Sequence, residues 1–145
     1  MVDIYYCMKT VKESNIGLSY GRGYVYSIQY HIVFCTKYRL PVLCNGLDAF
    51  VKNELKEIAD TLNFTITAVE VMPDHVHILI ECTPQLFIPT AIKIIKGNIA
   101  RKLFLRFPNL KKKLYGGHLW NPSYCVTTVS DRTTEMIKHY INNQQ

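Results

Sequence analysis

The chain has 145 residues, of which 48% are hydrophobic and 19% charged, a composition that suits one folded domain and excludes a disordered segment. Its five cysteines are scattered and lack Cys-x-x-Cys spacing, which excludes a disulfide framework and a cysteine zinc site and indicates reduced thiols. No apolar run approaches the ~20 residues of a membrane span and no signal-peptide pattern is present, so we expect a cytoplasmic protein, and the net charge of +6 favours a polyanionic partner.

The first long strand is predicted over residues 24–37, after an N-terminal lead-in of residues 1–23. Apolar and polar side chains alternate along 24–37, as expected of a strand that is buried on one face. His31 falls on the more polar face. Its imidazole can either hydrogen-bond within the sheet or orient a functional site. We expect residues 24–145 to form a single domain.

A histidine pair follows a predicted hairpin. Residues 47–62 repeat apolar positions at helical spacing, and the strand at 64–71 turns tightly at 72–74 into a second, antiparallel strand. Because strand side chains alternate, His75 and His77 leave the same face and Val76 points to the core. Two adjacent neutral imidazoles suit a divalent cation, and they are equally typical of a polar sheet face.

Basic residues gather in the second half of the chain. A helix predicted from residue 88 or 89 to 107 carries lysines and an arginine away from its apolar stripe, and a lysine run follows at 111–113. They are either phosphate contacts or ordinary solvated charge. The candidate phosphate contacts, with two from the exit of the first strand, are Lys37, Arg39, Lys93, Lys96, Arg101, Lys111, Lys112 and Lys113.

The C-terminal region reads as a strand over 118–129, interrupted by Pro122, and then a helix capped by Asp131. Tyr140 and Gln144 lie at i and i+4 and so share one helix face. Alone this spacing is typical of plain helix surface, but a phenol and an amide oxygen would complement a two-histidine site. The element order predicts an α+β, ferredoxin-like split βαβ sandwich. It has an antiparallel sheet, two helices on one face and a C-terminal helix that carries Tyr140.

The sequence resembles the HUH-type single-tyrosine transposases of the smallest prokaryotic insertion sequences. The resemblance spans residues 25–145 and rests on the motifs at 30–39, 73–79, 95–98, 119–120 and 140–144. Histidine, hydrophobe, histidine corresponds here to residues 75–77. Where many relatives carry glycine before the tyrosine helix, this chain has Val129, Ser130 and Asp131.

The resemblance implies a metal-dependent DNA strand transferase. His75, His77 and Gln144 would hold Mg²⁺ or Mn²⁺, and Tyr140 would attack the scissile phosphate to give a 5′-phosphotyrosine intermediate. The expected substrate is single-stranded DNA with hairpins at the element ends. The expected assembly is a homodimer that exchanges its tyrosine helices.

Three other functions fit parts of the pattern. A non-catalytic nucleic-acid-binding module on a ferredoxin-like scaffold would need the basic surface but not the histidines and Tyr140. A metal-dependent phosphodiesterase would hydrolyse with an activated water and leave no covalent adduct. An HUH replication or transfer nickase shares the chemistry, but the short chain favours the transposase.

Overall fold

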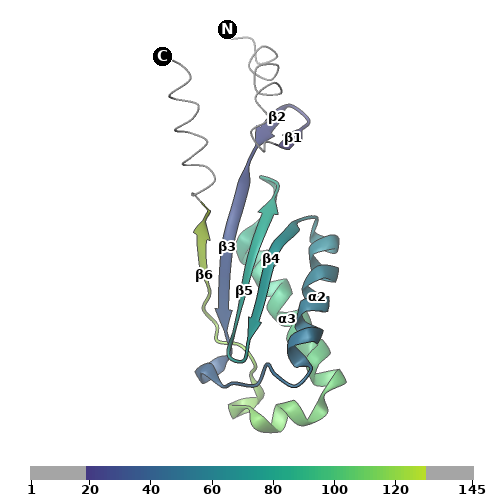
Figure 1. The fold of residues 1–145 in the computed structure, drawn as a ribbon, viewed down its shortest axis with the longest axis vertical. Helices are drawn as coiled ribbons and strands as arrows, with labels where there is room; N and C mark the ends of the chain where they lie inside the picture. The colour runs from purple at the N-terminus through teal and green to yellow at the C-terminus, as the bar shows by residue number, and fades with distance from the viewer. Residues whose placement is uncertain (1–18, 130–145) are drawn as a thin grey trace.

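The computed structural model describes residues 19–129 (Figure 1). The predicted C-terminal helix, with Tyr140 and Gln144, lies outside the described residues. The strands are β1 (Ser19–Gly21), β2 (Tyr24–Tyr26), β3 (Ile28–Cys35), β4 (Thr65–Met72), β5 (His75–Cys82) and β6 (Cys125–Thr128). The α-helices are α2 (Leu47–Leu62) and α3 (Ile88–Arg106), and the 3₁₀ turns are η1 (Lys37–Arg39), η2 (Pro108–Lys113) and η3 (Tyr115–Gly117).

The main sheet has the order β4-β5-β3-β6, with every neighbouring pair antiparallel. Two split βαβ units build it. In the first, β3 and β4 are joined through α2 and enclose β5; in the second, β5 and β6 are joined through α3 and enclose β3. This is the ferredoxin-like arrangement that the element order predicted, and the fold class is confirmed.

Both helices pack on one face of this sheet (Figure 1). Alternate residues of β5 are buried, and Val76, Ile78 and Ile80 are each at most 1% exposed. The helices meet them with side chains at helical spacing, namely Val51, Leu55, Ile58, Ile92, Ile95, Ile99 and Leu103. The other face of β5 is half-buried and carries His75 and His77.

Two strand predictions need correction. The strand predicted over 24–37 is broken at Ser27, because its first part forms β2 and pairs with β1 in a separate two-stranded ribbon. The second part, β3, ends at Cys35. The chain then leaves the strand direction in η1, where Tyr38 has a left-handed conformation (φ 57°). The ribbon also means that the predicted lead-in contains a strand.

The strand predicted over 118–129 is limited to β6 and one isolated bridge between Thr36 and Trp120. Pro122 cannot donate to a ladder, and the carbonyl groups on either side of it, of Asn121 and Ser123, accept hydrogen bonds from the Lys96 ammonium. The intervening segment therefore packs on α3 rather than extending the sheet. Among the described residues, no helix is long and apolar enough to span a membrane.

Candidate active site

The site centres on two imidazoles that project from the open face of β5. The ring centroids of His75 and His77 lie 4.9 Å apart, with the ring planes at 62°. In the strand register His77 stands opposite Val33 of β3 and Glu70 of β4. The pair therefore lies in the middle of the sheet width, supported by a strand on each side.

Asp74 in the β4–β5 turn fixes the first imidazole. Its Oδ1 lies 2.6 Å from His75 Nδ1, and its Oδ2 accepts a hydrogen bond from Arg39 Nε at 3.0 Å. The hydrogen bonds from His75 and Arg39 lower the pKa of Asp74, so that the carboxyl stays ionised. An ionised carboxylate only accepts, so Nδ1 of His75 donates the hydrogen bond to Asp74, and the lone pair of the neutral ring is then on Nε2.

His31 occupies the corresponding position beside the second imidazole. Its Nε2 lies 3.0 Å from His77 Nδ1, across the β3–β5 pair. Burial lowers the pKa of His77, and so does repulsion from the positive charge that His75 and His31 carry when they are protonated. His77 is therefore neutral near pH 7, the form that binds metals. The sequence left two roles open for His31, a hydrogen bond within the sheet or the orientation of a functional site. Its contact with His77 is both, because His77 belongs to the sheet and to the candidate site.

The nitrogen atoms left over suit a divalent cation. Both site histidines use Nδ1 inside the protein, which leaves Nε2 of each for a ligand on the open face. Within residues 19–129 no group of three or more His, Cys, Asp or Glu side chains is placed to hold a metal. The two predicted nitrogen ligands, His75 and His77, lie on the described sheet, and the predicted third ligand, Gln144, lies outside the described residues.

A groove of about 660 Å³ runs beside the pair. It is lined by His31, Glu70, His77 and the end of β6 with residues 127–129. Thr127 pairs with His31 in the register, so the chain that continues toward Tyr140 starts at the wall of this groove.

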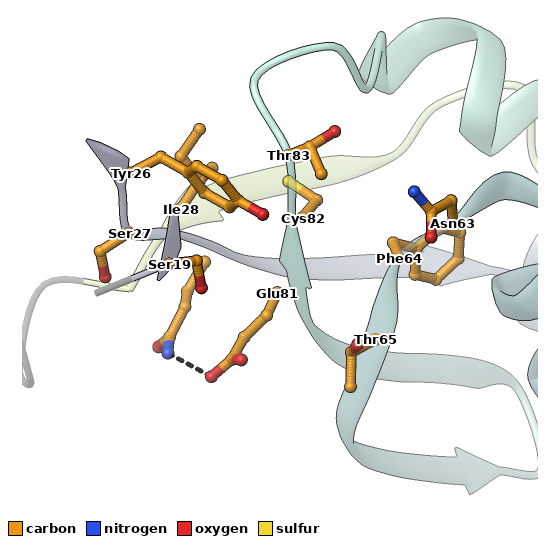
Figure 2. A pocket seen from close by; sticks show the side chains of 11 residues that line it. Ser19, Tyr26, Ser27, Ile28, Asn63, Phe64, Thr65, Glu81, Cys82 and Thr83 are labelled. Atoms are coloured by element: carbon orange, nitrogen blue, oxygen red, sulfur yellow. Dashed lines mark hydrogen bonds between the residues drawn. The ribbon is translucent and has the colours of Figure 1, made fainter. Parts of the chain in front are cut away.

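A smaller cavity of about 200 Å³ lies at the other end of the sheet. Figure 2 shows its lining of hydroxyl, amide and carboxyl groups, with Glu81 accepting a hydrogen bond of 2.7 Å from the Gln29 amide. Burial raises the pKa of the Cys82 thiol in its wall, so this sulfur stays protonated and unreactive. The imidazoles of His31 and His77 line the larger groove.

Several of the predicted phosphate contacts have partners inside the protein. Lys96 Nζ donates to the carbonyl oxygens of Asn121 and Ser123 at 2.8 and 2.7 Å, and burial lowers the pKa of this ammonium. Lys111 Nζ lies 5.6 Å from the ring centroid of Phe104.

Arg39 was predicted to contact phosphate, but in the structure it forms an ion pair with Asp74, the residue that contacts His75. The sequence analysis did not predict this ion pair. The only signal for it was an aspartate directly before the first histidine. The remaining exposed positions are Lys93, Arg101, Lys112 and Lys113, whose contact with DNA stays a prediction.

The sheet is covered by helices on one face and carries the paired histidines on the other. Comparison with known proteins assigns a chain of this kind to the transposases. The family described as "Transposase IS200 like" matches residues 24–144. The chain belongs to this family.

Individual relatives agree. The chain is 48% identical over 124 residues to the ISDra2 transposase TnpA of Deinococcus radiodurans, covering 86% of this chain and 89% of the relative. It is 30% identical over 119 residues to the transposase for insertion sequence element IS200 of Salmonella typhimurium, covering 82% and 78%.

Two solved structures share the fold. A putative transposase from Deinococcus radiodurans superposes with a TM-score of 0.74 at 48% identity, covering 88% of this chain and 98% of the other. A tyrosine transposase bound to a REP hairpin superposes with a TM-score of 0.55 at 15% identity, covering 84% and 67%. At that identity the second match shows the fold alone.

Proposed function

We propose that this transposase cleaves and rejoins single-stranded insertion-sequence ends through a 5′-phosphotyrosine intermediate at Tyr140. The observation that carries the proposal is the orientation of the two site histidines, whose Nδ1 atoms are engaged by neighbours and whose Nε2 atoms have no hydrogen-bond partner within residues 19–129. The groove beside them is lined by the last described residues of the chain that leads to Tyr140. A non-catalytic binding module has no use for this arrangement.

His75 and His77 would hold Mg²⁺ or Mn²⁺, with the Gln144 amide oxygen as third ligand. An ion bound there would supply polarisation of the scissile phosphate and would offset the charge that develops on it. A nitrogen and oxygen ligand set that leaves positions open for phosphate is compatible with both ions. Asp74 would orient His75 and His31 would orient His77, each through a contact with Nδ1 that leaves Nε2 to the ion.

Tyr140 supplies the nucleophile. A phenol has a pKa of about 10 and attacks poorly unless its phenolate or the transition state is stabilised. Its oxygen forms a bond to phosphorus as the bond from phosphorus to the 3′-oxygen breaks. The phenol loses its proton and the departing 3′-oxygen gains one. A 3′-hydroxyl later attacks the phosphotyrosine and restores a phosphodiester, so no nucleoside triphosphate is consumed.

The proposed substrate is single-stranded DNA with hairpins near the element ends. The net charge of +6 suits a polyanion, and the structural neighbour bound to a REP hairpin is consistent with hairpin DNA. We propose a homodimer in which the tyrosine helix of one subunit serves the histidines of the other. An HUH nickase would perform the same first cleavage but would not rejoin two element ends.

The test is a denaturing gel of the protein with labelled hairpin DNA carrying a single-stranded flank, in the presence of Mn²⁺. We expect wild type to form a denaturation-resistant adduct and Tyr140→Phe to form none while still binding the DNA. Tyr124→Phe, which changes another tyrosine, is the control and should form the adduct. Cleavage without an adduct would instead indicate hydrolysis by an activated water.

The third ligand has its own test, a Mn²⁺ titration of cleavage. A neutral amide is a weak ligand, so Gln144→Ala should cleave poorly at low Mn²⁺ and recover as Mn²⁺ rises. Gln144→Glu should bind the metal as well as wild type or better. If Gln144→Ala matches wild type throughout, the third ligand lies elsewhere.

A further inference from the structure

Two exposed tyrosines meet at the end of the sheet where β3 ends and β5 begins. The ring centroids of Tyr38 and Tyr115 lie 5.8 Å apart with planes at 88°, an edge-to-face pair. The residues are 67% and 70% exposed. Edge-to-face contact covers little of either ring, so flat aromatic surface stays open to solvent.

The turn that displays Tyr38 is strained and firmly held. Tyr38 and the following Arg39 both have positive φ angles, 57° and 54°, a region that non-glycine residues rarely adopt. Buried Thr36 anchors the turn, because its hydroxyl donates to the carbonyls of Leu40 at 2.8 Å and Asp74 at 3.1 Å. Strain of this kind persists where the surrounding structure enforces it, and it clusters at functional sites.

A matching turn presents the second ring. Gly116 and Gly117 directly follow Tyr115 with φ of 64° and 70°, which only glycine adopts without cost. A backbone hydrogen bond joins the two turns, since the Lys37 amide beside Tyr38 donates to the carbonyl of Leu119, shortly after Tyr115, at 2.8 Å. In Figure 1 the chain after β3 and the chain after α3 come together at this end of the sheet.

The pair is basic in its surroundings and connected to the site. Lys37 Nζ lies 5.6 Å from the Tyr38 ring centroid. Arg39, the next residue, is bonded to Asp74, which is bonded to His75. The lysines of residues 111–113 precede Tyr115 in the chain. Aromatic surface among cations is the combination that binds single-stranded nucleic acid, with bases on rings and phosphates on ammonium groups.

We propose that Tyr38 and Tyr115 form a stacking platform for an unpaired base of the single-stranded DNA, close to the phosphate that is cleaved. The inference rests on the proposed function for the identity of the substrate. It adds a base-binding subsite outside the histidine groove, reached through Arg39 and Asp74. Neither tyrosine takes part in the chemistry.

Binding is measured in EDTA, so that cleavage does not contribute, on hairpin DNA whose single-stranded flank carries 2-aminopurine at successive positions. Wild type should quench the fluorescence at one or two positions. The Tyr38→Ala, Tyr115→Ala double variant should lose that quenching and bind about 5- to 160-fold more weakly, the range expected when one stacked base is released. The corresponding double Phe variant keeps both rings and should behave as wild type.

Phe87→Ala is the matched control, since Phe87 is 66% exposed but precedes α3, beyond the other end of β5. It should keep both quenching and affinity. Unchanged quenching in the double Ala variant would overturn the platform, and a simultaneous shift from dimer to monomer would assign the tyrosines to a protein interface. The gel test for a covalent adduct leaves Tyr38 and Tyr115 unchanged. If wild type formed no adduct but still quenched 2-aminopurine, the proposed chemistry would be wrong and the proposed base-binding subsite would stand.

Discussion

The open face of the sheet and the surface around α3 use their polar side chains in opposite ways. On the open face, His75 and His77 each use one ring nitrogen on a neighbour and keep the other for a ligand. Around α3, Lys96 and Lys102 direct their ammonium groups into the protein, to loop carbonyls and to Glu54 of α2. The first arrangement prepares a site, and the second holds the fold together.

The pKa shifts do not all follow this division, because burial lowers the pKa of Lys96 as well as that of His77. The lowered pKa keeps His77 neutral near pH 7, which is the form that the proposed metal binding needs. The pKa of Lys102 is raised, first by its hydrogen bond to Glu54, and that bond links α3 to α2 at 2.6 Å. A positive charge on α3 is therefore not by itself a sign of DNA contact. A lysine whose ammonium is already bonded within the protein, such as Lys96 or Lys102, is a weaker candidate for a phosphate contact.

The first prediction tests whether the histidines on the open face of the sheet are needed for cleavage. We expect His75→Ala and His77→Ala each to reduce single-turnover cleavage on the order of 10²–10³-fold, because the missing charge stabilisation amounts to several kcal/mol. Raising Mn²⁺ should not restore it. His118→Ala, at an exposed position outside the site, is the control and should cleave normally. Normal cleavage by either site variant would contradict the assignment.

A smaller effect is expected from the group that orients His75. Asp74→Ala removes the acceptor of the Nδ1 proton, and outer-shell changes of this kind weaken metal binding by about 10–100-fold. Asp74→Asn keeps an acceptor oxygen but loses the charge paired with Arg39, so it should fall between Ala and wild type. Electron paramagnetic resonance of free Mn²⁺, without DNA, gives the affinities. Equal affinity in all three proteins would show that the turn does not orient the ligand.

Local pattern was enough to predict the elements that organise this fold. The apolar spacing of residues 47–62 reproduces the bounds of α2, and alternation along β5 placed both site histidines on one face and Val76 in the core. These features depend on neighbours within a few residues. The strand expected at 118–129 is only partly confirmed, as β6 and the bridge at Trp120. The segment between them hydrogen-bonds instead to Lys96, which lies 25 residues before Asn121 in the chain.

The sequence offered His31 as a residue that could orient the site, but it could not identify the atoms that meet within the site, for the same physical cause. His31 and His77 are 46 residues apart, and their contact follows from the β3–β5 register. The Asp74–Arg39 pair depends on the left-handed turn at residues 38–39. Residue type suggested which side chains could act, and only the sheet register and the turns decide which ones meet.

The lysines that remain exposed can be separated from the buried ones through salt dependence. Lys112→Gln with Lys113→Gln should weaken hairpin DNA binding and flatten the slope of log K against log salt by roughly one unit for each lysine that neutralises a phosphate. Cleavage at saturating DNA should be unchanged, since neither residue is near the histidines in the chain or the sheet. Fluorescence anisotropy over a range of salt concentrations measures the slope. An unchanged slope would mean that these charges are only solvated.

The smallest effect is expected at Lys96, and it should appear in stability. Its ammonium satisfies the carbonyls of Asn121 and Ser123, and the indole of Trp120 donates to the Lys96 carbonyl at 3.0 Å. Lys96→Met removes two charge-assisted hydrogen bonds at a half-buried position, which we expect to lower the free energy of unfolding by about 1–3 kcal/mol. Lys93→Met, on an exposed position of the same helix, should change it by less than about 0.5 kcal/mol. Urea unfolding gives both values. Lys96→Met should leave the salt slope of DNA binding unaltered, because the ammonium is held by the loop before β6. A flattened slope with full stability would instead return Lys96 to the DNA-binding surface and erase the division between the two regions.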